Sequence, residues 1–199
     1  MSAQVLTSFL PQRLKEATSE LHQELESLSI SKSILKPDVT CEEYLKYLDL
    51  MHDIIYSVES TLFPLLHDYF PDLEDRKKAR WIEQDFSQLS YPKHTYINVL
   101  EGMETISVGF ALGMLYVLEG STLGGRIISK HILKTLGYDF HTGAAYFNGY
   151  GDRTGEYWKN FLAVLVAHEK THNTSGEIIE GAVFAFQKIK NHFIANTSR

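Results

Sequence analysis

The chain lacks several features that mark specialised proteins. Cys41 is its only cysteine, so an internal disulfide, a cysteine-rich metal site and a CxxCH haem attachment are all excluded. No apolar run reaches the roughly 18 residues that span a membrane. The N-terminus, MSAQVLTSFLPQR, has no basic start followed by an apolar stretch, so we see no signal peptide. We therefore expect a cytoplasmic protein without a membrane partner.

The overall charge and size narrow the class further. A formal net charge of -6 argues against a general nucleic-acid binder, although it leaves room for a local basic site. With 199 residues, 44% hydrophobic and 22% charged, the chain has the composition of one globular domain. We expect that domain to span residues 1–199, with roughly the first nine and last five residues at its periphery.

Apolar residues recur three and four positions apart, and no segment alternates convincingly with period two, so the pattern predicts an all-α fold. A capping box at residues 40–43 begins one helix, and Pro64 should kink or end it. The charged run DRKKAR, residues 75–80, is expected on a solvated helix face. The predicted helices cover residues 10–28, 40–67, 73–89, 107–136, 154–171 and 177–193.

The predicted helix 107–136 contains an unusual row of glycines. Each glycine inside a helix costs roughly 1 kcal/mol relative to alanine. At 100° per residue, Gly109, Gly113, Gly120 and Gly124 fall within a sector of about 60°, with Gly125 beside them. Such a row allows close approach either by another helix, as in small-xxx-small packing, or by a flat or bulky ligand. The sequence leaves these two interpretations about equally supported.

Lys15 and His22 form a second notable pair. Both lie on the shoulder of the apolar face of the first predicted helix, about 10.5 Å apart along one line. A histidine in that position can bind a metal inside a pocket, and the lysine can pair with an anionic group of the same ligand. Spacing alone favours the plainer interpretation, a partly buried structural histidine and a surface lysine. The glycine- and aromatic-rich loop 137–153 is expected to form a pocket rim.

Residues 168–172, HEKTH, match the HExxH motif of zinc proteases. That chemistry requires a helix that continues, a third ligand and a cleft. The predicted helix ends directly after His172, and neither Glu177 nor Glu180 stands out as a third ligand. We interpret the motif as a solvated helix end.

Three segments together resemble one known family. LKEATSELHQELE, residues 14–26, resembles the proximal helix of haem oxygenases. GSTLGG, residues 120–125, is similar to the distal helix of that family. NGYG at 148–151 and TGEYW at 154–158 resemble its bacterial branch, which includes enzymes that supply bacteriophytochromes with biliverdin. The resemblance implies a single-domain, multi-helical haem oxygenase-like bundle.

The resemblance assigns roles to individual residues. It implies that His22 is the axial iron ligand, that Lys15 contacts a haem propionate, and that Glu26 is the glutamate one turn after the histidine. Haem would be both substrate and cofactor, with iron as the bound metal. The glycines that would lie over the haem face are Gly120, Gly124 and Gly125.

The motif GSTLGG departs from mammalian-type haem oxygenases at Ser121, where those enzymes carry an aspartate that organises bound water. The bacterial branch of the family varies at this position. Gly120, Ser121 and Gly124 are the predicted catalytic residues. Further candidates, chosen by position, are Glu119 and Arg126 for the distal network and Lys188 and Lys190 for the second propionate.

The implied activity is oxidative cleavage of haem to biliverdin, ferrous iron and CO. It uses O2 and electrons from a ferredoxin, a flavodoxin or a reductase, and a bacteriophytochrome is one recipient of the product. The main alternative is a non-catalytic haem carrier or sensor, motivated by Ser121. A thiaminase-like relative would leave His22 without a role. A purely structural helical protein would leave the glycine row and the Lys15–His22 line unexplained.

Overall fold

The structure is a computed structural model that describes residues 9–103 and 105–197. Within these residues it is all-α and contains no strand, as the sequence predicts. The single-domain assignment remains a prediction. The helices are α1 (Leu10–Ser27), α2 (Ser29–Ser33), α3 (Cys41–Leu66), α4 (Ala79–Gln88), α5 (Val108–Leu136), α6 (Ala145–Asn148), α7 (Thr154–His172) and α8 (Ser175–Asn196).

Local signals in the sequence set the start of α3 and both ends of α5. The hydroxyl of Thr40 accepts the Glu43 N–H at 3.2 Å, and the Glu43 carboxylate accepts the Thr40 N–H at 3.0 Å, so the predicted capping box begins α3. Pro64 lies inside α3, which ends two residues later. The Ser107 hydroxyl caps α5, and Gly137, at φ +75°, ends it in the left-handed conformation that glycine adopts freely.

Two expectations about residues 73–89 were wrong. The helix predicted from residue 73 begins only at Ala79, after a 3-10 turn over Glu74–Arg76. The run 75–80 is not a solvated face, because Arg76 and Lys78 are buried. Their burial follows from a buried acidic partner on α5, described below. Helices α2 and α6 were not predicted, because they are too short to show a helical period.

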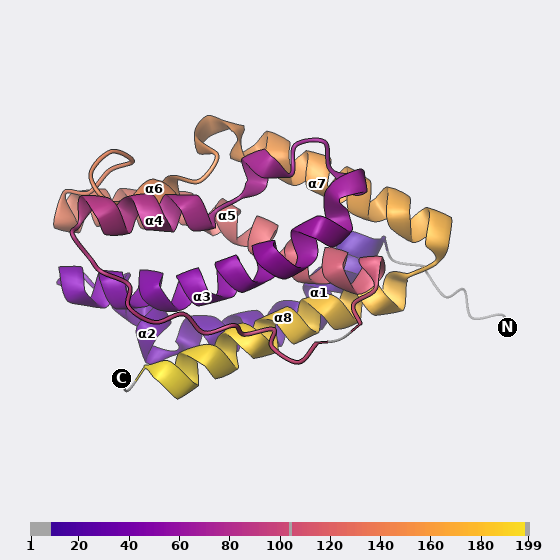
Figure 1. The fold of residues 1–199 in the computed structure, drawn as a ribbon, viewed down its shortest axis with the longest axis horizontal. Coiled ribbons are helices and arrows are strands. Elements are labelled where there is room, and N and C mark those ends of the chain that lie inside the picture. The colour runs from indigo at the N-terminus through magenta and orange to yellow at the C-terminus, as the bar shows by residue number, and fades with distance from the viewer. Residues whose placement is uncertain (1–8, 104, 198–199) are drawn as a thin grey trace, which may run out of the picture.

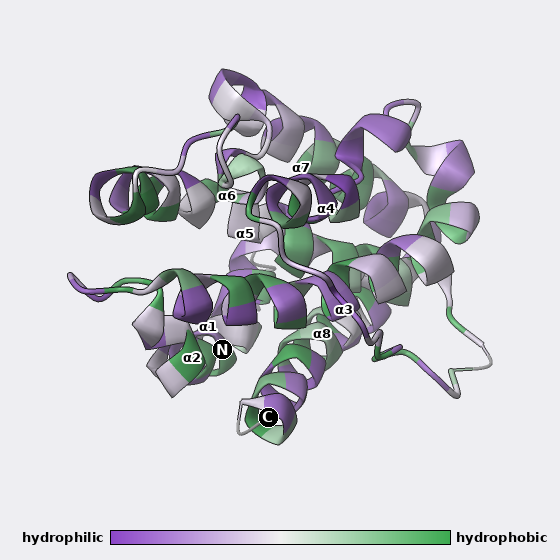
Figure 2. Ribbon diagram, turned by 60° about the vertical axis from the view of Figure 1, so that its left-hand side comes forward, coloured by the Kyte–Doolittle hydropathy of each residue, from purple (hydrophilic) through white to green (hydrophobic). Residues whose placement is uncertain are grey.

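Helix α5 is the central element of the fold. It packs most extensively on α8 and also contacts α3, α6 and α7, while α1 lies against α8. Figure 1 shows α3 crossing the middle of the molecule, with α8 on one side and α4 and α7 on the other. In Figure 2, α3 and α8 alternate green and purple along their length, as expected for helices with one buried apolar face.

The glycine row of α5 serves two purposes. A Cβ atom at Gly113 would lie 1.9 Å from the Ile178 carbonyl oxygen of α8, and one at Gly181 would lie 2.0 Å from that of Phe110. These glycines let the α5 and α8 backbones touch, so the packing interpretation holds for the first half of the row. The second half, Gly120 to Gly125, faces a cavity instead.

Among the described helices, α5 alone is long and apolar enough to cross a membrane by length and composition. Some 56% of its most apolar window is buried within the fold, and the core helix of a globular domain meets the same criterion.

Candidate functional site

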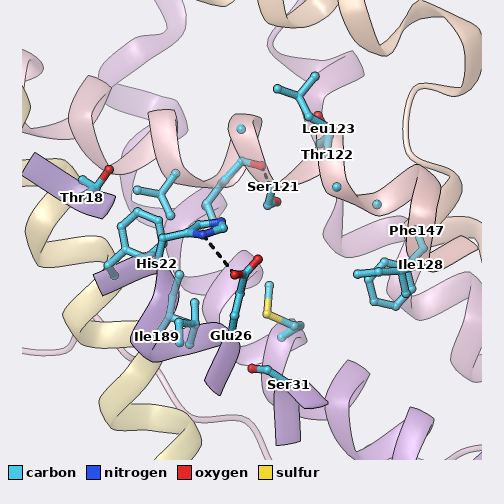
Figure 3. Close-up of a pocket in the computed structure, with 18 of the residues that line it drawn as sticks. Thr18, His22, Glu26, Ser31, Ser121, Thr122, Leu123, Ile128, Phe147 and Ile189 are labelled. Carbon is cyan, nitrogen blue, oxygen red and sulfur yellow. Dashed lines mark hydrogen bonds and ion pairs between the residues drawn. The ribbon is translucent and has the colours of Figure 1, made fainter. Parts of the chain in front are cut away.

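A cavity of about 780 Å³ lies between α1 and the second half of α5. Figure 3 shows His22 and Glu26 on one side, Ser121, Thr122 and Leu123 on the other, and Phe147 and Ile128 at the far end. Side chains from α2, α3, α6, α7 and α8 complete the lining. The seven residues to which the resemblance gives a catalytic or haem-binding role all line this one cavity: Lys15, His22, Glu26, Gly120, Ser121, Gly124 and Gly125.

The imidazole of His22 is oriented from two sides. Its Nδ1 atom lies 3.6 Å from the Glu26 Oε2 atom, one turn along α1. The ring of Phe186 on α8 meets it edge to face, with the ring centroids 5.7 Å apart. A carboxylate at Nδ1 leaves Nε2 as the nitrogen available to a metal.

Lys15 lies two turns before His22 and lines the same cavity. It forms no ion pair within the described part of the chain, so its ammonium group is available to an anion at the cavity mouth. The two other lysines considered for anionic groups are placed differently. Lys190 pairs with Glu24 at 2.7 Å, Lys188 lies 5.2 Å from the ring centroid of Phe184, and neither lines the cavity.

The α5 side of the cavity offers hydrogen-bond acceptors. The Ser121 hydroxyl donates to the Leu118 carbonyl at 2.8 Å, and the Thr122 hydroxyl donates to that of Glu119 at 2.6 Å. Because each hydroxyl proton is committed to the helix backbone, these two oxygens can act only as acceptors toward the cavity. A Cβ atom at Gly124 would meet nothing within 4 Å, so the glycine leaves open space there.

Tyrosine hydroxyls supply the complementary donors, and the sequence analysis did not identify them. Tyr47 on α3 and Tyr146 on α6 both line the cavity. Burial raises the pKa of both phenols. Both groups are therefore neutral O–H groups at pH 7. Tyr146 belongs to the aromatic loop that the sequence marked as a rim.

A buried charge cluster lies directly behind the distal glycines. The Glu119 carboxylate accepts from the Arg76 Nη1 atom at 2.8 Å, the Lys78 Nζ atom at 2.5 Å and the Tyr150 hydroxyl at 2.9 Å. All three charged side chains are almost completely buried, and Lys78 also lines the cavity. The sequence analysis named Glu119 but placed its partners in solvent. Arg126, also named, pairs with Asp152 at 3.2 Å and does not line the cavity.

The HExxH segment, residues 168–172, does not line the cavity. Helix α7 ends at His172, followed by Asn173 at φ +56°. His168 is buried edge-on against Tyr69, with ring centroids 5.4 Å apart. Across residues 9–103 and 105–197, no group of three or more His, Cys, Asp or Glu side chains is placed to hold a metal ion.

Comparison with known proteins agrees with this arrangement. The Heme oxygenase family profile matches residues 8–194, so the chain belongs to the haem oxygenase family, an enzyme class that degrades haem. It is 29% identical over 187 residues to heme oxygenase PigA of Pseudomonas aeruginosa, covering 89% of this chain and 87% of that protein.

Solved structures show the same fold. The NO- and CO-bound heme oxygenase from Neisseria meningitidis matches with a TM-score of 0.80 at 27% identity, over 95% of this chain and 92% of that one. The haem complex of heme oxygenase-1 from the cyanobacterium Synechocystis matches with a TM-score of 0.68 at 19% identity, over 94% and 91% of the two chains. The family and fold expected from the resemblance are thereby confirmed.

Proposed function

We propose that this protein binds haem between α1 and α5 and cleaves it to biliverdin, ferrous iron and CO, using O2 and supplied electrons. The observation that carries the proposal is that His22 and Lys15 share one cavity with Gly120 and Gly124. Membership of the haem oxygenase family supports it.

The cavity suits the shape and chemistry of haem, a flat and largely apolar disc with two carboxylates. A volume of about 780 Å³ lies in the range of ligand pockets, and most of the surface that lines the cavity is apolar. One imidazole and one unpaired ammonium group lie on the same helix, which matches an iron at the centre of the disc and a carboxylate at its edge. When bound, haem supplies the iron that reacts with O2 and the ring carbon that is oxidised.

The residues of this chain have separate tasks in that proposal. His22 would bind the iron through Nε2, and the Glu26 carboxylate, 3.6 Å from Nδ1, places a negative charge beside the opposite side of the ring. Lys15 neutralises one carboxylate at the mouth of the cavity. Gly120 and Gly124 keep side chains away from the opposite face. Ser121 accepts and Tyr146 donates hydrogen bonds, which together orient water on that face.

The test is spectroscopic. Purified protein is mixed with one equivalent of hemin, and ascorbate is added in air with catalase present. We expect a Soret band that gives way to the far-red absorbance of biliverdin. His22→Ala should weaken or alter the Soret band, whereas His94→Ala, at an exposed loop position, should not. Failure to form any Soret band would contradict the proposal.

One observation favours a second candidate, a haem carrier or sensor. The proton of the Ser121 hydroxyl is committed to the Leu118 carbonyl, so this side chain cannot donate toward the cavity as a catalytic acid would. A Soret band that persists with ascorbate and again with a ferredoxin reducing system would favour that candidate.

We further propose an electron donor of the ferredoxin, flavodoxin or reductase kind, a bacteriophytochrome as one recipient of biliverdin, and a cytoplasmic location. Reduction of the haem complex by each purified donor in turn tests the first of these.

A further inference from the structure

Helix α6 is a single turn of four residues, and it carries part of the cavity wall. Tyr146 and Phe147 both line the cavity, and Figure 3 shows Phe147 at the end farthest from His22. A helix this short has no stability of its own, so its position depends on what holds it.

The main anchor is a carboxylate on α4. Asp85 is completely buried, and its two oxygens accept the backbone N–H groups of Ala145 at 2.6 Å and Tyr146 at 3.0 Å. It makes no ion pair within the described residues. Burial raises its pKa to about 6, although the two backbone N–H bonds act in the opposite direction. Burying a charged carboxylate without a counter-ion costs free energy, and here the two backbone N–H groups offset part of that cost.

Three further features constrain the same turn. The buried Tyr44 hydroxyl donates to the Gly143 carbonyl at 2.8 Å, just before α6. Gly149 ends α6 at φ +52° and ψ −129°, a backbone conformation that is open to glycine and strained for other residues. On the α5 side, a Cβ atom at Gly125 would lie 3.0 Å from the Phe147 carbonyl oxygen. The wall is therefore anchored from α3, α4 and α5.

We propose that Asp85 is a positioning residue for regiochemistry: by fixing α6, it determines how the haem ring is rotated in the cavity and so which biliverdin isomer forms. This inference rests on the proposed function. A disc held by one axial ligand can turn about that bond, and only contacts at its edge select one rotation. Phe147 supplies such a contact at the end of the cavity away from His22, and the adjacent Tyr146 also lines the cavity.

The test compares Asp85→Asn with Glu83→Gln, a matched loss of charge at an exposed side chain on the same helix, where the amide oxygen can still accept from His52. The oxygen of the introduced amide can still accept one N–H, but its NH2 group opposes the second. In the haem-free protein we expect amide exchange at Tyr146 to be at least about tenfold faster. Haem affinity should stay within about threefold, because His22 is untouched.

Two readouts report ring rotation directly. The paramagnetically shifted haem methyl signals of the ferric complex should show a second set in Asp85→Asn, and its biliverdin should contain a second isomer. Gly149→Ala loosens the opposite end of α6 and should act in the same direction, which keeps the test available if Asp85→Asn does not fold. Glu83→Gln should match the wild type throughout.

The outcomes separate the two hypotheses. Wild-type methyl signals and isomer distribution in both α6 variants would overturn the role of Asp85 while leaving the proposed function intact. A wild type that binds haem but never degrades it would overturn the proposed function alone, because the methyl signals still report rotation. Absence of any haem complex would overturn both.

Discussion

Removing the charge of Glu119 should destabilise the protein strongly. Glu119→Gln leaves Arg76 and Lys78 buried; among the described residues Arg76 then keeps only Asp72 as an acidic partner, and Lys78 keeps none. Breaking a buried ion pair by removing one partner costs about 3–5 kcal/mol, because the other charge remains out of water without compensation. For a chain of this length, each kcal/mol lowers the melting temperature by about 2–4 °C. We therefore expect a decrease of roughly 6–20 °C.

The assay is thermal and urea unfolding of the haem-free protein, followed by circular dichroism. Glu156→Gln is the matched control, since Glu156 pairs with Arg153 at 3.3 Å and both side chains are more than half exposed. That change should cost no more than about 0.5 kcal/mol. The double variant Lys78→Met with Glu119→Gln removes one stranded cation and should recover more than about 1 kcal/mol of the loss.

Two results would refute this reasoning. One is a cost below about 1 kcal/mol for Glu119→Gln, which would show that water or rearrangement compensates the two cations. The other is strict additivity in the double variant, which would show that Lys78 and Glu119 are not coupled.

Three further predictions concern α5 and Asp85. Gly113→Ala places a Cβ atom 1.9 Å from the Ile178 carbonyl oxygen and should destabilise the protein severely. The Cβ atom of Gly124→Ala meets nothing within 4 Å, so this change should raise the free energy of unfolding by about 0.5–1 kcal/mol. Urea unfolding measures both effects. Gly124→Leu should lower haem uptake in a Soret titration while leaving the helix content unchanged; unaltered uptake and turnover would contradict the distal-face assignment. The pKa of Asp85 in the folded state is raised from 3.8 to about 6, so the folded state binds the proton more tightly than the unfolded state. As pH rises from 4 to 6, the free energy of unfolding of the wild type should therefore fall by up to about 3 kcal/mol relative to that of Asp85→Asn. Parallel stability–pH curves for the two proteins would contradict that pKa.

Much of the candidate site could be predicted from local sequence because its residues lie close together in the chain. Lys15, His22 and Glu26 share one helix and Gly120 to Gly125 share another, so two short motifs that resemble the haem oxygenase family contain all seven residues. The sequence could not show what each part of the glycine row on α5 contacts. Gly113 and Gly124 lie in the same row, yet one meets a helix backbone and the other meets open space, because α8 crosses only part of α5.

The charged and polar residues around the site show most clearly what could not be predicted from the sequence. A run such as DRKKAR looks solvated in sequence, since lysine and arginine are rarely buried without a partner. Their partner, Glu119, lies more than 40 residues away in the chain, and only folding brings it to Arg76 and Lys78. Asp85 likewise meets its two amides 60 and 61 residues further along.

The sequence by itself determined the helical class, most helix ends, the family and the two helices that face each other across the cavity. Those features depend on period, capping and short motifs, which are properties of neighbouring residues. Only the tertiary structure decided which glycines contact a helix, which charges are buried, and which tyrosines and wall residues enclose the cavity. These depend on contacts between distant segments, whose free energy no local pattern encodes.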